Sequence, residues 1–161
     1  MTYKEFFVET LNDEMPRFER VFKSLPAEPA DLRHHPKNKN VREIVETMVW
    51  ETAVTPEMLK TGILDFSKKP EMKGTLHDLA VQFSKDLESV RMIAENMSDA
   101  DWESPANMME EGKSVWESTK GKMAWGLVLD LIHHRGQIST HIRAHGGKVP
   151  SIYGPSGDME H

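Results

Sequence analysis

Apolar residues recur at helical spacing in four separate segments of this chain, and this pattern constrains the fold more than any other feature. In the first segment Thr2 and Glu5 have the spacing of a capping box, which predicts where a helix begins. The apolar residues behind this cap share one helical face: they are Phe6, Phe7, Leu11, Met15, Phe18 and Phe22. The first 22 residues are therefore predicted to form an amphipathic helix.

Three further helices follow from similar signals. Asn40 and Glu43 predict a second helix that extends over residues 42–64, and Thr75 with Asp78 predicts a third that reaches Met97. The last helix is expected over residues 123–145, where a continuous apolar stripe ends at two glycines suited to a left-handed cap. Prolines at positions 16 and 56 are expected to bend the first and second helices.

Two long connections separate these helices. Residues 24–40 contain three prolines and read as a loop that crosses over the helices. Residues 98–122 show neither helical nor strand periodicity and are predicted to be an irregular crossover with a short helix or a pair of strands. The predicted fold is an all-α four-helix bundle with long crossover connections, formed by a single domain over residues 1–161.

Composition narrows the functional classes. Without cysteine, any metal must be held by nitrogen and oxygen ligands. A net charge of −6 disfavours nucleic acid as a partner, because nucleic-acid affinity depends on clustered lysine and arginine. No apolar run has the roughly 18 to 20 residues that a membrane span needs, and the N-terminus is acidic where a signal peptide would be apolar. We expect a cytoplasmic protein without a membrane partner.

Residues 129–147, LDLIHHRGQISTHIRAHGG, contain four of the eight histidines. On a helical wheel His134, His141 and His145 fall within about 40° of each other, whereas His133 points about 100° away from His134. Asp130 precedes His134 by one helical turn, as chelation from one helix face requires, although the carboxylate could equally orient the imidazole. His141 and His145 are predicted to be solvated near the helix end, where they oppose the helix dipole.

The second helix offers a facing acid. Thr47 and Glu51 lie on the same side as the core residues Ile44 and Met48, and a buried Glu51 would need a partner. That partner could be a metal shared with Asp130 and His134, a cation such as Arg135, or water at the edge of the core. The last two alternatives are favoured, because long acidic side chains often reach solvent from such an edge.

The segment HHRGQISTHIRAHGGKVPSIYGPSGD, residues 133–158, resembles the C-terminal signature of the DinB family of bacterial proteins, also called DinB/YfiT-like. Members commonly read H-x-x-x-H-R-G-Q there, followed by a Leu-Arg-x-x-Gly segment and a proline-rich tail. The resemblance implies a four-helix bundle, often dimeric, and a zinc- or nickel-type ion held by three histidines. One of these comes from the second helix and two from the H-x-x-x-H pair. Some members are thiol-dependent transferases that use bacillithiol or mycothiol, and the family name does not imply DNA binding.

Transferred to this chain, the ligand set is incomplete. His134 matches the second histidine of the pair, Asp130 stands where the first is expected, and Thr47 stands where the histidine of the second helix is expected. The favoured hypothesis is a DinB-like bundle whose metal binding is lost or weakened, and it leaves open whether the protein is an enzyme. The alternative is a metal-dependent thiol transferase or hydrolase in which His134, Asp130 and Glu51, with Thr47 or water beside them, hold one zinc, nickel, manganese or iron ion. A third hypothesis is a non-catalytic homodimeric or small-ligand-binding bundle.

The remaining signature residues have structural explanations. Arg135 is expected to pair with an acid or a partner chain, Gly136 to permit close helix packing, and Gln137 to satisfy backbone groups at a helix crossing. The tail around Tyr153 is expected to cover the bundle.

Overall fold

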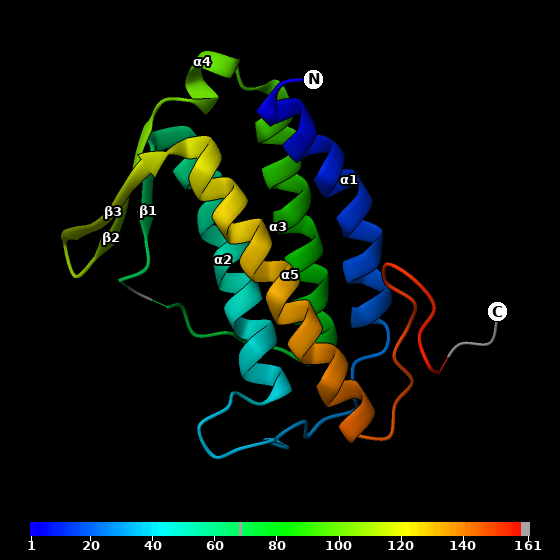
Figure 1. The fold of residues 1–161 in the computed structure, drawn as a ribbon. Helices are drawn as coiled ribbons and strands as arrows, with labels where there is room; N and C mark the ends of the chain where they lie inside the picture. Colours follow the sequence, from blue (N-terminus) through cyan, green and yellow to red (C-terminus); the bar gives the residue numbers. More distant parts are fainter. Residues whose placement is uncertain (68, 159–161) are drawn as a thin grey trace.

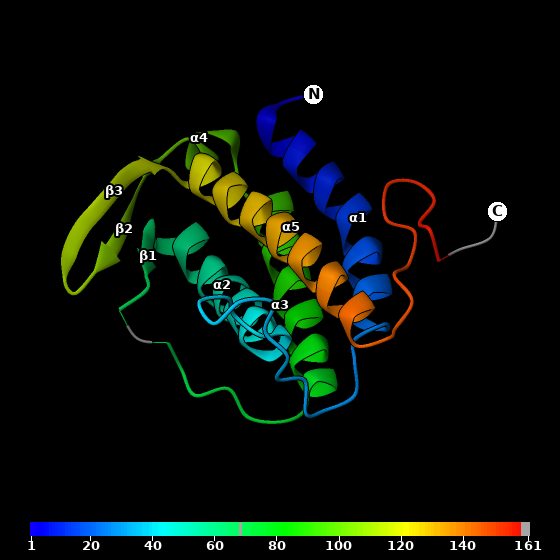
Figure 2. The ribbon, with the colours of Figure 1, turned by 60° about the horizontal axis from the view of Figure 1, so that its bottom comes forward.

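The computed structural model describes residues 1–67 and 69–158, and within them four long helices lie side by side (Figure 1). These helices are α1 (Tyr3–Phe22), α2 (Val41–Thr61), α3 (Leu76–Asn96) and α5 (Lys120–Ala144). α1 and α2 each pack against both α3 and α5, so the core lies between the four helices (Figure 2). The fold is mostly helical, as predicted.

Three of the four predicted helix starts are confirmed. The side chains of Thr2, Asn40 and Thr75 each accept a hydrogen bond from the backbone N–H of the third helical residue. The side chain of that residue in turn accepts one from the backbone N–H of the capping residue, which completes three capping boxes. α1 and α2 continue through their internal prolines. α2 ends at Thr61 rather than Leu64, because Gly62 adopts a left-handed conformation at φ 77°.

The prediction of an all-α fold overlooked a small sheet. The described residues form three strands in the order β1 (Ile63–Asp65), β2 (Pro105–Glu110) and β3 (Lys113–Thr119). β1 pairs with β2 in parallel, and β2 pairs with β3 as an antiparallel hairpin. A half-buried strand can be recognised in a sequence because buried and exposed residues alternate along it. The two strands of this hairpin lack a clean alternation of that kind.

Residues 98–122 therefore hold both a short helix and a strand pair. The short helix is α4 (Asp99–Trp102), and its Trp102 packs against Phe7 at 4.9 Å between ring centroids. α5 begins at Lys120, three residues before the predicted start, with Thr119 as its cap. Lys120 is buried and its ammonium donates to Asp101 at 2.7 Å, which joins the crossover to the start of α5.

The segment after α5 folds back along α1 (Figure 1). Arg20 of α1 donates a hydrogen bond to the Ser151 carbonyl at 3.1 Å, and the Tyr153 hydroxyl donates to Glu14 at 3.0 Å. The predicted covering tail is thus present. Of the helices formed by the described residues, none is long and apolar enough to cross a membrane.

Candidate metal centre

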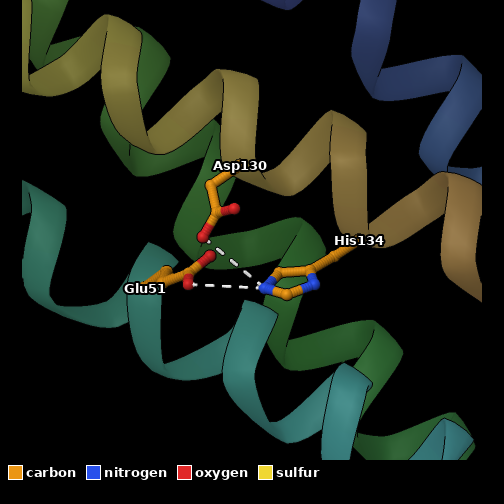
Figure 3. A group of neighbouring side chains, drawn as sticks. All are labelled: Glu51, Asp130 and His134. Carbon is orange, nitrogen blue, oxygen red and sulfur yellow. Dashed lines mark ion pairs between the residues drawn. The ribbon is translucent and has the colours of Figure 1, made fainter. Parts of the chain in front are cut away.

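Three side chains from two helices converge at the centre of the α2–α5 contact (Figure 3). Glu51 comes from α2, and Asp130 and His134 come from adjacent turns of α5; one ligand atom from each lies within 4.8 Å of the other two. His134 Nε2 is 3.5 Å from Asp130 Oδ2 and 3.8 Å from Glu51 Oε1. The structure therefore brings together three of the four residues that the sequence proposed.

The cluster has a buried side and an open side. The Glu51 side chain is 8% exposed and that of His134 is 11% exposed, whereas Asp130 is 51% exposed. Glu51 Oε2 is buried without a hydrogen-bond partner, and leaving such an atom unsatisfied costs about 1–3 kcal/mol or more for a charged group. Burial raises the pKa of the Glu51 carboxyl, while the neighbouring His134 opposes this rise.

The His134 ring is held by a neighbour on its own helix. Gln137 Oε1 lies 2.8 Å from His134 Nδ1, and the amide nitrogen of Gln137 lies 2.9 Å from His133 Nε2. When this amide donates to His133, its oxygen accepts from His134 Nδ1–H, and the lone pair of neutral His134 Nε2 then faces the two carboxylates. Gln137 thus contacts side chains, and the expectation that it satisfies backbone groups is wrong.

The imidazole and the carboxylates interact strongly even without a cation between them. The Glu51 carboxylate is the main cause of a raised pKa at His134, with smaller contributions from Gln137 and Asp130, while burial of the ring opposes the rise. Protonated His134 can therefore balance part of the negative charge. The two ion-pair distances nevertheless exceed the 2.7–2.9 Å of a charge-assisted hydrogen bond.

The donor set fits a divalent ion. Metal bonds of about 2.0–2.2 Å to nitrogen and oxygen place neighbouring donors about 3–3.5 Å apart. The separations of 3.5 and 3.8 Å from His134 Nε2 need a small contraction, and the two carboxylates, whose ligand atoms lie within 4.8 Å of each other, also have to approach the ion by side-chain rotation. Two carboxylates and one imidazole favour manganese, iron(II) or zinc over the softer ions that thiolates select.

A cleft of about 490 Å³ opens onto the acidic side of the cluster. Glu51 and Asp130 lie in its wall, and the rest of the wall is mainly apolar, including Phe66, Met108 and Trp116. Phe66 directly follows β1, Met108 lies on β2 and Trp116 on β3, so the small sheet forms one side of the cleft.

Thr47, the fourth proposed residue, lies one turn before Glu51. Its hydroxyl donates to the Glu43 carbonyl at 2.9 Å and accepts from the Lys39 ammonium at 2.8 Å. A role for Thr47 at a metal stays a prediction, and it would require the loss of the Lys39 contact.

The other histidines of this segment agree with expectation only in part. His133 is exposed and its Nε2 contacts Gln137, and it is not part of the cluster, as predicted. His141 was expected to be solvated, but it is 2% exposed because the loop between α1 and α2 covers it, and its ring centroid lies 4.4 Å from that of His34. His145 is half-buried and its Nδ1 lies 2.8 Å from the His141 carbonyl.

Arg135 and Gly136 directly follow His134, and the structure confirms the expected role of only the first. Arg135 is buried and donates to Glu14 of α1 at 2.6 Å, which confirms that it pairs with an acid. Gly136 is exposed and a Cβ there would meet nothing within 4 Å, so the prediction that it permits close helix packing is wrong.

Fold and cluster together define a mostly helical protein with an acidic and histidine-containing site between two of its long helices.

No family model and no curated protein matches the chain. Among solved structures, a DinB-like protein from Bacillus cereus ATCC 10987 matches with a TM-score of 0.74 and 16% identity over 94% of this chain and 100% of that one. A DinB-like protein, YjoA, from Bacillus subtilis matches with a TM-score of 0.70 and 14% identity over 92% of this chain and 99% of that one. The chain therefore has a DinB-like fold, and the resemblance seen in its C-terminal sequence is confirmed at the level of fold.

Proposed function

We propose that this chain is a DinB-family four-helix-bundle protein that binds one divalent metal ion through Glu51, Asp130 and His134. The observation that carries the proposal is the buried Glu51 carboxylate, which has one oxygen without a partner and faces a second carboxylate and an imidazole. A shared cation would satisfy all three groups at once.

An ion pair alone accounts for this arrangement less well. A protonated His134 has one Nε2–H to donate, and it would be expected to form a hydrogen bond of about 2.7–2.9 Å with one of the two carboxylates. Here both contacts are longer, and Glu51 Oε2 stays unsatisfied. The departure from three histidines thus favours a harder ion, manganese, iron(II) or zinc, rather than the loss of the site.

The proposed activity is that of a metal-dependent transferase or hydrolase acting on a small molecule or a thiol. A bound ion would lower the pKa of a water or thiol ligand and so supply a nucleophile near neutral pH. The chain's own groups would then hold the site: Gln137 fixes the His134 ring, and half-exposed Asp130 borders the cleft through which a substrate enters. The apolar cleft wall favours substrates with an apolar portion.

Elemental analysis of protein purified without a nickel column tests the proposal. We expect about one metal ion per chain, and restoring the ion to chelator-treated protein at 100 times its Kd should stabilise the fold by about 2.7 kcal/mol. Glu51→Gln should abolish this stabilisation, whereas Glu57→Gln, an exposed acid further along α2, should retain it. Metal-free protein from metal-supplemented cells that shows no stabilisation by manganese, iron(II), zinc or nickel would contradict the proposal.

Homodimerisation and a cytoplasmic location stay predictions. Sedimentation analysis and cell fractionation check them.

A further inference from the structure

A second cavity, of about 320 Å³, lies against the same part of α5. His134 and Gln137 form part of its wall, and His141 lies further along the helix. The loop between α1 and α2 supplies His34, Lys37 and Lys39. This cavity therefore shares the His134 ring with the candidate metal centre but is lined by different residues from the acidic cleft.

The charge of this cavity is opposite to that of the whole chain. Among the described residues, none that lines it is an aspartate or a glutamate, although the chain carries a net charge of −6. Its ionisable side chains are two lysines and three histidines. A cavity with one sign of charge concentrates ligands of the other sign.

The two ammonium groups are not neutralised by acids within the described structure. Lys39 donates to the neutral hydroxyl of Thr47, and Lys37 forms no ion pair there. Glu43 is near Lys39, but its carboxylate is paired with Arg33 at 2.6 Å. Both lysines are thus available to an anion.

His141 gives an independent indication. Its side chain is almost fully buried, it lines the cavity, and its Nδ1 has no hydrogen-bond partner. Burial, followed by the charges of His34 and His145, lowers its pKa, while a backbone contact at Lys39 opposes this. The cavity thus disfavours further positive charge unless a negative group enters it.

We infer that this cavity binds a small anionic molecule, one that carries a carboxylate or a phosphate group, between His34, Lys37 and Lys39 and in front of His141. Such an anion would neutralise the lysines and remove the repulsion between the histidines. The cavity exceeds a single phosphate in size, so the anionic group would belong to a larger molecule that reaches toward His134. The inference does not require a metal, and it adds a second binding site beside the one proposed above.

Isothermal titration of chelator-treated protein with inorganic phosphate, and separately with malonate, tests the inference at low ionic strength. We expect one binding site, and we expect the double variant Lys37→Gln/Lys39→Gln to weaken binding by about tenfold, equivalent to about 1.4 kcal/mol. Lys122→Gln, which removes a positive charge at the distant start of α5, should leave the affinity unchanged. The lysines are exposed, so circular dichroism should show an intact fold in each variant.

Binding should also depend on salt. Affinity should fall as salt is added, because the attraction between an anion and the exposed lysines is screened.

Two results would overturn the inference: no binding of either anion, or binding that the double lysine variant leaves unchanged. A response to only one anion would show which chemical group the cavity takes. If the protein binds the anions but no metal, the proposed function is contradicted and this inference is not. If it binds metal but neither anion, this inference is contradicted and the proposed function is not.

Discussion

Arg135 and Glu14 are far apart in the sequence, yet they form a buried ion pair between α5 and α1. The guanidinium also lies over the Phe18 ring at 4.5 Å, and the Tyr153 hydroxyl contacts both partners. The expected pairing of Arg135 with an acid is therefore also a contact between α1, α5 and the tail.

Arg135→Ala should destabilise the protein by about 3 kcal/mol, because it removes one of the two cations that pair with the buried Glu14 carboxylate and leaves it only Arg17 and the Tyr153 hydroxyl. Urea unfolding at neutral pH measures the loss. As a control, Arg143→Ala removes an exposed arginine that pairs with Asp158, and it should cost less than about 1 kcal/mol. Equal losses in the two variants would show that the buried pair contributes no more than a surface one.

At the level of elements, the junction between α2 and β1 determines where the sheet lies. Gly62 ends α2 with a φ of 77°, and its carbonyl accepts a hydrogen bond from Asn107 of β2 at 2.7 Å. A Cβ at this position would lie 2.7 Å from the Pro105 carbonyl oxygen. The glycine therefore permits both the left-handed cap and the close approach of β2.

Gly62→Ala should lower the free energy of unfolding by about 2 kcal/mol or more, through left-handed strain together with displacement of β2. Gly112→Ala is a matched control, since Gly112 has the same φ of 77° but open space around it, and it should show only the strain of about 1 kcal/mol. Chemical denaturation of both variants separates the two contributions. If the two variants lose the same free energy of unfolding, the close contact with Pro105 does not contribute to the loss in Gly62→Ala.

Across the whole molecule, the C-terminal tail and the candidate metal centre occupy different sides of α5. The tail contacts α1 through Glu14 and Arg20, whereas the metal centre faces α2 (Figures 1 and 3). Stability contributed by the tail should therefore be separable from metal binding.

Truncation after Gly147 should lower the free energy of unfolding by about 2–4 kcal/mol, because it removes buried Val149 and the Tyr153 contacts. Metal affinity measured by titration should stay within about twofold, since distant sites act independently. Tyr153→Phe keeps the tail and should cost only about 1 kcal/mol. A truncated protein that folds but no longer binds metal would refute this separation.

By itself the sequence determined the four long helices, their three capping boxes and the pairing of Asp130 with His134 on one face of α5. These features depend on residues three or four positions apart, whose geometry a helix imposes locally. Only the tertiary structure decided that Glu51 faces this pair, that Glu14 is the partner of Arg135, and that the loop before α2 buries His141. The parallel pairing of β1 with β2 was likewise decided at that level. Each of these contacts joins segments distant in the chain, and the path of a loop or the rotation of one helix against another leaves no periodic signal in the sequence.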